Sequence, residues 1–196
     1  GHKIIGVDNF NDFYPVPLKE SNVKDLIEKG ATVIRGDLRH DATYLDIPTQ
    51  IDYVYHCAAQ PGISSASTFE DYNSNNLVAT KKLVKFIKEK CQIKFFVNTG
   101  TSSIYGEHVD CDEDFAPQPI SNYGVTKLAA EQLMLSSVRQ GFFRGCSLRL
   151  YSVYGSRERP DKMFSRLITS ALKNESFPLY EGSLEHRRSF THVTDI

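Results

Sequence analysis

The chain has 196 residues, of which 40% are hydrophobic and 24% are charged, which suits one globular core or one domain with part of a second. Its formal net charge of -1 gives no general attraction to nucleic acid or to an anionic membrane surface. The longest apolar runs hold only a few residues, far fewer than a membrane-spanning helix needs. We therefore expect neither nucleic acid nor a membrane as a partner.

The four cysteines have no spacing typical of a disulfide framework or a zinc site. No two stand as CxxC, and no pair of histidines lies at ligand spacing beside them. Cys57 and Cys146 fall in apolar segments. Unconnected thiols fit a reducing compartment, so we expect a cytoplasmic protein that binds no metal.

Short apolar strands alternate with longer amphipathic stretches along most of the chain. Hydrophobic periodicity predicts strands at 3–7, 32–35, 53–57, 94–98 and 146–150. It predicts helices at 18–29, 69–90 and 122–140. Strands separated by helix-length segments imply parallel βαβ units, so we predict an α/β fold with a Rossmann-like, doubly wound parallel sheet.

The alternation changes after Gly155. A polar loop at 156–160 is followed by a predicted helix at 163–173 and a predicted short strand at 177–180. We therefore divide the chain into a nucleotide-binding domain, 1–155, and part of a small substrate-binding region, 156–196.

Tyr123 and Lys127 form the sharpest chemical signal. A spacing of four residues places both on one face of a helix, one turn apart. An ammonium beside a phenol lowers the pKa of the phenol, which then suits acid–base catalysis near neutral pH. Such a pair is more often an ordinary surface pair, so its context decides the interpretation.

That context consists of polar and small residues at the ends of predicted strands. Thr99 to Ser103 follows one strand, and ligands of open α/β sheets bind at the carboxyl ends of strands. An acid at the end of an early strand accepts hydrogen bonds from a ribose diol, and Asp8 has that place. Asp37 and the pair Ala58 and Ala59 follow two further strands. Taken alone, each of these residues is also common in ordinary turns.

Together these residues resemble the extended short-chain dehydrogenase/reductase family, which contains the nucleotide-sugar epimerases and dehydratases. The resemblance implies NAD as the cofactor, a nucleotide sugar as the substrate, and Thr101, Tyr123 and Lys127 as the catalytic residues. The implied cofactor-binding residues are Asp8, Asn9, Asp37, Leu38, Ala58, Ala59, Gln60, Asn75, Tyr123, Lys127 and Tyr151. The implied substrate-binding residues are Ser102, Ser103, Ser152, Arg159 and Arg188. The resemblance also implies a homodimer formed through the helices at 69–90 and 122–140.

The chain departs from the family at its start. The family opens with a strand and a GxxGxxG turn that holds the cofactor pyrophosphate, and none of the 12 glycines forms that pattern. We therefore expect a chain that lacks the first βα unit.

Two segments bear on the substrate. Ser102 and Ser103 stand where the related 4,6-dehydratases carry an acidic pair, which favours simple epimerisation. The segment 157–161 resembles one in UDP-glucuronate 4-epimerases, where an arginine lies near the sugar carboxylate, and Arg159 matches it. The resemblance therefore favours C4 epimerisation of UDP-glucuronate to UDP-galacturonate, and it implies a role in polysaccharide biosynthesis. The alternatives are another epimerase, a dehydratase or a decarboxylase of the same family, or a truncated non-catalytic member.

Overall fold

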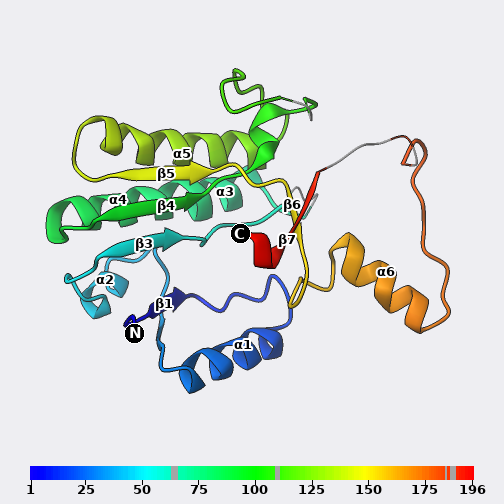
Figure 1. Cartoon of the computed structure of the whole chain (residues 1–196), viewed down its shortest axis with the longest axis horizontal. Coiled ribbons are helices and arrows are strands. Elements are labelled where there is room, and N and C mark those ends of the chain that lie inside the picture. The colour runs from blue at the N-terminus through cyan, green and yellow to red at the C-terminus, as the bar shows by residue number, and fades with distance from the viewer. Residues whose placement is uncertain (63–65, 109–110, 184, 186–188) are drawn as a thin grey trace. The chain divides into compact units, whose positions relative to one another are not determined.

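The computed structural model describes residues 1–62, 66–108, 111–183, 185 and 189–196 (Figure 1). The strands are β1 (Ile5–Asp8), β2 (Thr32–Arg35), β3 (Tyr53–His56), β4 (Phe95–Thr99), β5 (Gly145–Leu148), β6 (Ser152–Tyr154) and β7 (Phe190–His192). The α-helices are α1 (Val16–Glu28), α2 (Thr43–Asp46), α3 (Phe69–Tyr72), α4 (Ala79–Lys90), α5 (Asn122–Arg139) and α6 (Met163–Leu172). A π-helix, η1 (Asn73–Val78), joins α3 to α4, and two 3-10 turns are η2 (Ser102–Tyr105) and η3 (Val193–Asp195).

All the strand pairs in the described residues are parallel. β1 pairs with β2, and β3, β4 and β5 form a second group with β4 in the middle. This is the predicted Rossmann-like α/β fold, because each pair is joined by a crossover. In doubly wound folds a central strand separates the counterparts of β1 and β3, and no strand among the described residues fills that position.

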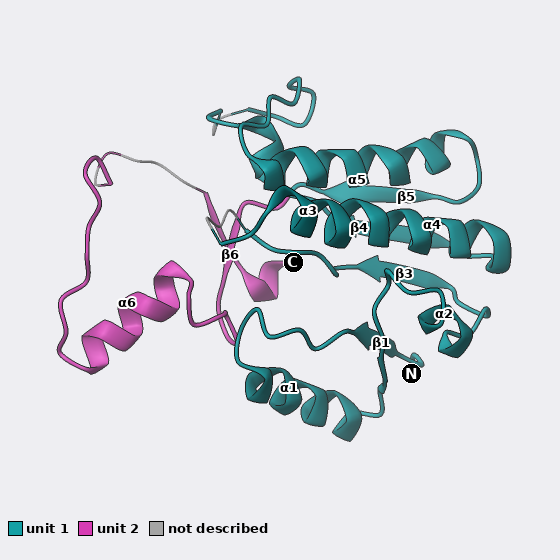
Figure 2. Cartoon of the chain, turned by 180° about the vertical axis from the view of Figure 1, so that it is seen from behind, with its two compact units in different colours: residues 1–149 teal, residues 150–196 magenta. Residues whose placement is uncertain are grey.

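The chain divides into two compact units, Gly1–Arg149 and Leu150–Ile196 (Figure 2). The first contains five of the strands and the second contains the β6–β7 pair and α6. The boundary that we drew between 155 and 156 concerns function and stays a prediction.

The core of the first unit forms where α4 and α5 pack against the β3–β4–β5 sheet. α4 buries one stripe, made by Leu83, Val84 and Ile87, because these positions recur at the helical period. In β4 the side chains of Phe96 and Asn98 are buried in alternation with half-buried neighbours. Phe96 stacks on Phe143 with ring centroids 5.4 Å apart, which fixes β4 against the segment that leads into β5.

The predicted helix at 69–90 is present with a change of pitch inside it. Thr68 caps its start in a capping box with Asp71, since each side chain bonds the backbone N–H of the other residue. Residues 73–78 then take the wider π-helical turn before α4 begins. A π turn inserts an extra residue and often marks a functional site.

The predicted strand at 177–180 is wrong. These residues are irregular, and Leu179 and Tyr180 are exposed, because none of the strands that the structure describes pairs with them. The sequence also failed to predict the short elements α2, β6 and β7. Among the described residues, no helix has the length and apolar content needed to cross a bilayer.

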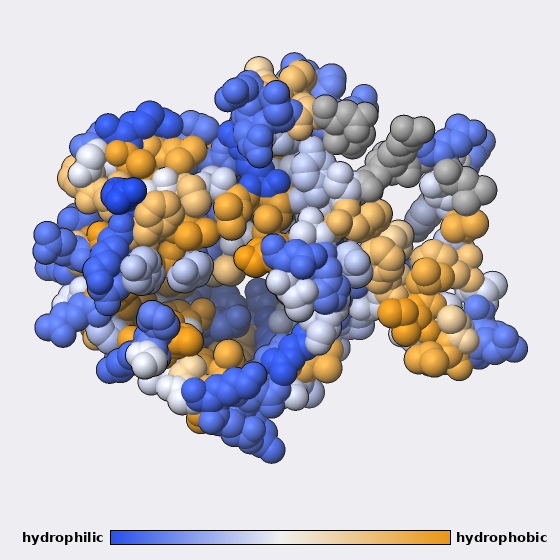
Figure 3. Space-filling model, in the orientation of Figure 1, coloured by the Kyte–Doolittle hydropathy of each residue, from blue (hydrophilic) through white to orange (hydrophobic). Residues whose placement is uncertain are grey.

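The second unit has a small aromatic cluster of its own. Tyr154 in β6 packs on Phe164 of α6 and on His192 of β7, and Phe164 also packs on Phe190. The remaining apolar side chains of α6 are largely exposed and form an orange surface at the right of Figure 3. They are Met163, Leu167, Ile168 and Leu172.

Candidate functional site

A cavity of about 320 Å³ lies at the carboxyl ends of β1, β3 and β4, where ligands of open α/β sheets bind. Most of the predicted cofactor-binding residues line it, although they come from segments far apart in the chain. They are Asp8, Asn9, Asp37, Leu38, Ala58, Ala59, Asn75, Tyr123 and Lys127. The lining also contains Lys19, Gly36, Cys57 and Gly100, which we did not single out as site residues from the sequence.

The start of α5 brings Tyr123 and Lys127 to this cavity. Ser121 caps the helix by accepting a hydrogen bond from the N–H of Gly124 at 3.1 Å. A Cβ on Gly124 would lie 2.6 Å from the backbone oxygen of Ser103, so only glycine allows α5 to approach η2 this closely. The first turn of α5 therefore lies directly against the turn that follows Thr101.

Lys127 is buried, with 7% of its surface exposed, and its Nζ donates to the backbone oxygen of Thr99 at 2.6 Å. Burial lowers its pKa to about 8, while electrostatic interactions with Cys57 and Glu131 act in the opposite direction. The ammonium form therefore still predominates at pH 7. A desolvated ammonium one turn from Tyr123 is the arrangement that the sequence pattern predicts.

Thr101 caps the start of η2 and is 7% exposed. Its Oγ1 accepts a hydrogen bond from the N–H of Ser103 and lies 3.2 Å from the Ser103 hydroxyl. The neighbouring Gly100 donates its N–H to Leu148 at 2.8 Å, which fixes the turn to the end of β5. Gly100 lines the cavity, whereas Thr101, Ser102 and Ser103 are not among its lining residues.

Acidic and amide side chains occupy the end of the cavity beside β1 and β2. Asp8 accepts a hydrogen bond from the N–H of Phe10 at 2.7 Å, and Asn9 donates to Asp37 at 3.0 Å. The guanidinium of Arg39 also donates to Asp37. The pKa of the Asp37 carboxyl is therefore held well below its usual range, chiefly by the Arg39 bonds.

The π-helix fixes the loop that follows β3. Asn76, which is 1% exposed, accepts from the N–H of Gln60 at 2.7 Å and donates to Thr126 of α5 at 3.1 Å. His56 bonds Thr80 at 2.8 Å, and burial together with the charge of Lys127 lowers the pKa of His56 to about 4. Gln60 is thus held by η1 and does not line the cavity.

The remaining predicted residues lie in the second unit or outside the described residues. Tyr151, Ser152 and Arg159 belong to the second unit, where Ser152 begins β6. Arg159 pairs with Asp161 at 3.5 Å. The prediction for Arg188 lies outside the described residues.

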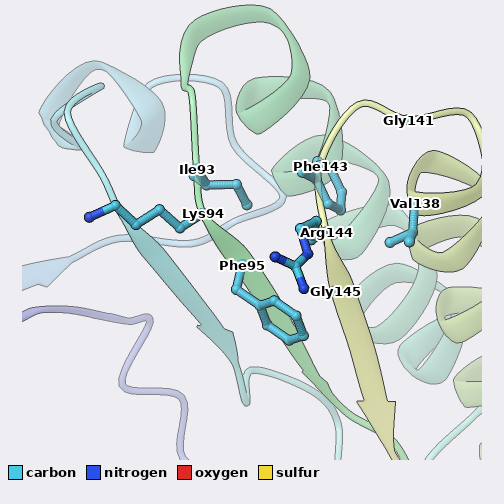
Figure 4. A pocket seen from close by; sticks show the side chains of 8 residues that line it. All are labelled: Ile93, Lys94, Phe95, Val138, Gly141, Phe143, Arg144 and Gly145. Carbon is cyan, nitrogen blue, oxygen red and sulfur yellow. The ribbon is translucent and has the colours of Figure 1, made fainter.

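A second cavity, of about 690 Å³, lies at the amino ends of β4 and β5 (Figure 4). Its lining is mostly apolar and backbone, with Lys94 and Arg144 as its charged side chains. Figure 4 shows the Lys94 side chain directed away from the others, and its ammonium pairs with Asp52 at 2.7 Å. No acid–base pair lines this cavity, so we assign the candidate site to the smaller cavity at the carboxyl ends.

A parallel α/β fold with a polar cavity at its strand ends, a buried lysine and a tyrosine one helical turn away is typical of nucleotide-binding enzymes. The family model described as "NAD dependent epimerase/dehydratase family" matches residues 1–196. The chain belongs to this family.

Several relatives are similar over nearly the whole chain. A Bacillus cereus UDP-glucuronic acid 4-epimerase, solved with UDP-glucuronic acid and NAD, is 34% identical with a TM-score of 0.87; the match covers 98% of this chain and 62% of that one. "Uncharacterized UDP-glucose epimerase YtcB" of Bacillus subtilis is 35% identical over 99% of this chain and 62% of its own length. UDP-glucuronate 4-epimerase 1 of Arabidopsis thaliana is 31% identical over 100% of this chain and 48% of its own length. The chain thus spans about half to two thirds of the length of these relatives.

Proposed function

We propose that this chain carries the cofactor site and catalytic residues of an NAD-dependent nucleotide-sugar 4-epimerase, with UDP-glucuronate and UDP-galacturonate as its substrate pair. The observation that carries the proposal is the cavity that Tyr123 and the buried Lys127 share with Asp8 and Ala58. The family membership and the UDP-glucuronate 4-epimerases among the relatives support it.

The cavity residues suit two parts of NAD. The carboxylate of Asp8 at the end of β1 is placed to accept hydrogen bonds from the adenosine ribose. Ala58 and Ala59 are small enough for the flat nicotinamide ring to approach the backbone. The cavity residues identify no site for the pyrophosphate, since the sequence contains no GxxGxxG pattern. The fit therefore concerns the ribose and nicotinamide ends.

The proposed chemistry begins with proton transfer from the substrate. Tyr123, as a phenolate, takes the proton from the 4-hydroxyl of the sugar, and Thr101 donates a hydrogen bond to the same oxygen. Lys127 favours the phenolate through its positive charge. NAD, when bound, would supply the acceptor for the C4 hydride and its donor to the opposite face. Between these two events the 4-keto sugar turns over, and Tyr123 then returns the proton.

Arg159 is the proposed ligand for the sugar carboxylate. A guanidinium binds a carboxylate in a planar, two-pronged geometry. A 4-keto uronate is a β-keto acid and loses CO₂ when its carboxylate aligns with the carbonyl π-system. Arg159 would hold the carboxylate out of that alignment, with Ser152 and Arg188 as further proposed sugar ligands.

Two measurements test the proposal. Calorimetric titration of the chain with NAD⁺ asks whether the cavity binds the cofactor. Incubation with NAD⁺ and UDP-glucuronate, followed by NMR of the sugar, asks whether the 4-epimer forms. Binding of NAD⁺ without any 4-epimer would refute the epimerase proposal and favour a dehydratase or decarboxylase. No binding of NAD⁺ would favour the non-catalytic alternative.

We also propose that the protein acts as a cytoplasmic homodimer that contacts itself through the predicted helices at 69–90, which comprise α3, η1 and α4, and at 122–140, which contain α5. Light scattering on a sizing column measures the mass directly, and a monomer at micromolar concentration would refute the dimer.

A further inference from the structure

Glu131 is a fully buried carboxylate, with 0% of its surface exposed, on α5 one turn after Lys127. Both of its oxygens accept hydrogen bonds. Arg149 donates to them through Nε and Nη2, the shorter bond being 2.8 Å, and Ser147 donates its hydroxyl at 2.9 Å. A buried charge needs such partners because its desolvation is costly. The proposed mechanism gives this group no task.

Arg149 extends the network to the turn that follows Thr101. Its Nη1 donates at 2.7 Å to the hydroxyl of Tyr105, the last residue of η2, and at 2.7 Å to the backbone oxygen of Glu113. The Glu131 carboxylate raises the pKa of Arg149, so this guanidinium stays charged. The ion pair thus connects α5, the end of β5 and η2.

The strand end that carries Thr101 passes directly over this ion pair. A Cβ on Gly100 would lie 2.8 Å from the Ser147 hydroxyl and 3.2 Å from Glu131 Oε2. The Ser147 hydroxyl also accepts from the side chain of Asn98 in β4 at 2.9 Å. The backbone just before Thr101 therefore rests on the groups that surround the Glu131 carboxylate.

We infer that Glu131 and Arg149 are positioning residues, which hold the Thr101 turn against the helix that carries Tyr123 and Lys127. That this positioning serves catalysis rests on the proposed function. The network that joins Glu131 and Arg149 to the Thr101 turn is a property of the folded chain. The charge of Glu131 acts on Lys127 as well, together with the other ionisable groups around that ammonium. These groups are His56, at the end of β3, and Cys57, which follows it.

NMR of the chain without cofactor or substrate tests the inference, so that its failure is distinct from failure of the proposed function. Lys127 is followed by the pH titration of its side-chain carbon signals, and the turn is followed by the amide signals of Thr101 and Ser103. In Glu131→Gln the Lys127 titration shifts to lower pH, because a negative charge that favours the ammonium is lost. The turn signals also move in this variant. The control Glu89→Gln, which removes an exposed acid 3.9 Å from Lys85, changes neither.

Tyr105→Phe separates the two roles. It removes the hydroxyl that accepts from Arg149 and leaves the Glu131 ion pair in place, so the turn signals move while the Lys127 titration stays at the wild-type pH. A folded Glu131→Gln variant with wild-type signals at both Lys127 and the turn overturns the inference. If Glu131→Gln does not fold, Tyr105→Phe decides, and unchanged turn signals in that variant overturn the inference.

Discussion

Gly124 determines how closely Tyr123 approaches the Thr101 turn, and Gly124→Ala tests that closeness. Alanine at a helical position favours folding by at most about 1 kcal/mol over glycine. The new Cβ, however, would lie 2.6 Å from the backbone oxygen of Ser103 and 3.1 Å from Cβ of Pro119. Overpacking against atoms that cannot rotate away costs about 1–3 kcal/mol. Because 2.6 Å is far shorter than an ordinary contact, the cost falls at the upper end of that range, and we expect a net loss of about 1–2 kcal/mol in the free energy of unfolding, opposite in sign to the propensity effect.

Urea unfolding followed by circular dichroism measures this change. The matched control is Val125→Ala, the next residue on α5, whose side chain is 44% exposed and whose replacement is expected to change stability by no more than about 0.5 kcal/mol. If Gly124→Ala is as stable as the wild type or more so, η2 does not lie against α5 as described. The reasoning that brings Tyr123 to the Thr101 turn would then be refuted.

Three further predictions concern stability. Phe96 lies in the core at 0% exposure, and Phe96→Ala is expected to lower the free energy of unfolding by about 3–5 kcal/mol. The control Tyr55→Ala, at 72% exposure, is expected to change it by about 0.5 kcal/mol or less. Equal effects of the two variants on urea unfolding would contradict the assignment of Phe96 to the core. His56 has a pKa lowered from 6.5 to about 4, so the stability that it contributes is complete above pH 6.5 and is lost as the pH falls toward 4. Urea unfolding of the wild type and of His56→Gln between pH 4 and 7 checks this. If the free energy of unfolding depends on pH equally in the two proteins, the buried imidazole is not held neutral. Asp37 has a lowered pKa, so the stability that its carboxylate contributes is present above pH 3.8 and is lost below it. Asp37→Asn is expected to lower the free energy of unfolding in urea by about 1 kcal/mol at pH 7 and by progressively less in acid. A loss that does not depend on pH would count against the ion pair with Arg39.

The sequence predicts most of the first unit because its elements are locally periodic. The stripe of Leu83, Val84 and Ile87 identifies a helix without any knowledge of the sheet. The π turn at 73–78 could not be predicted in the same way. It is held by Asn76, whose bonds to Gln60 and Thr126 join residues that are distant in sequence. The error at 177–180 has the same origin, since an apolar run forms a strand only when a partner strand is present.

In the candidate site, too, the sequence predicted the local features and missed those that depend on long-range packing. The spacing of Tyr123 and Lys127 is local, so the sequence predicted their common face, and both line the cavity. The position of Thr101 depends on how its strand end meets the rest of the fold, and its hydroxyl bonds Ser103 and is not part of the lining. The pairing of Glu131 with Arg149 arises only when α5 packs beside β5, and no spacing in the sequence signals it.

We propose that Tyr123 and Lys127 serve a C4 oxidation and re-reduction in this cavity. The most direct test supplies UDP-glucuronate carrying deuterium at C4, with NAD⁺, to the wild-type chain and to Tyr123→Phe. The account predicts a 4-epimer that keeps its deuterium at C4, and a rate lower by on the order of a hundredfold or more in the variant, because the acid–base group is lost. A product that has exchanged its C4 label with solvent, or equal rates in the two proteins, would contradict the account.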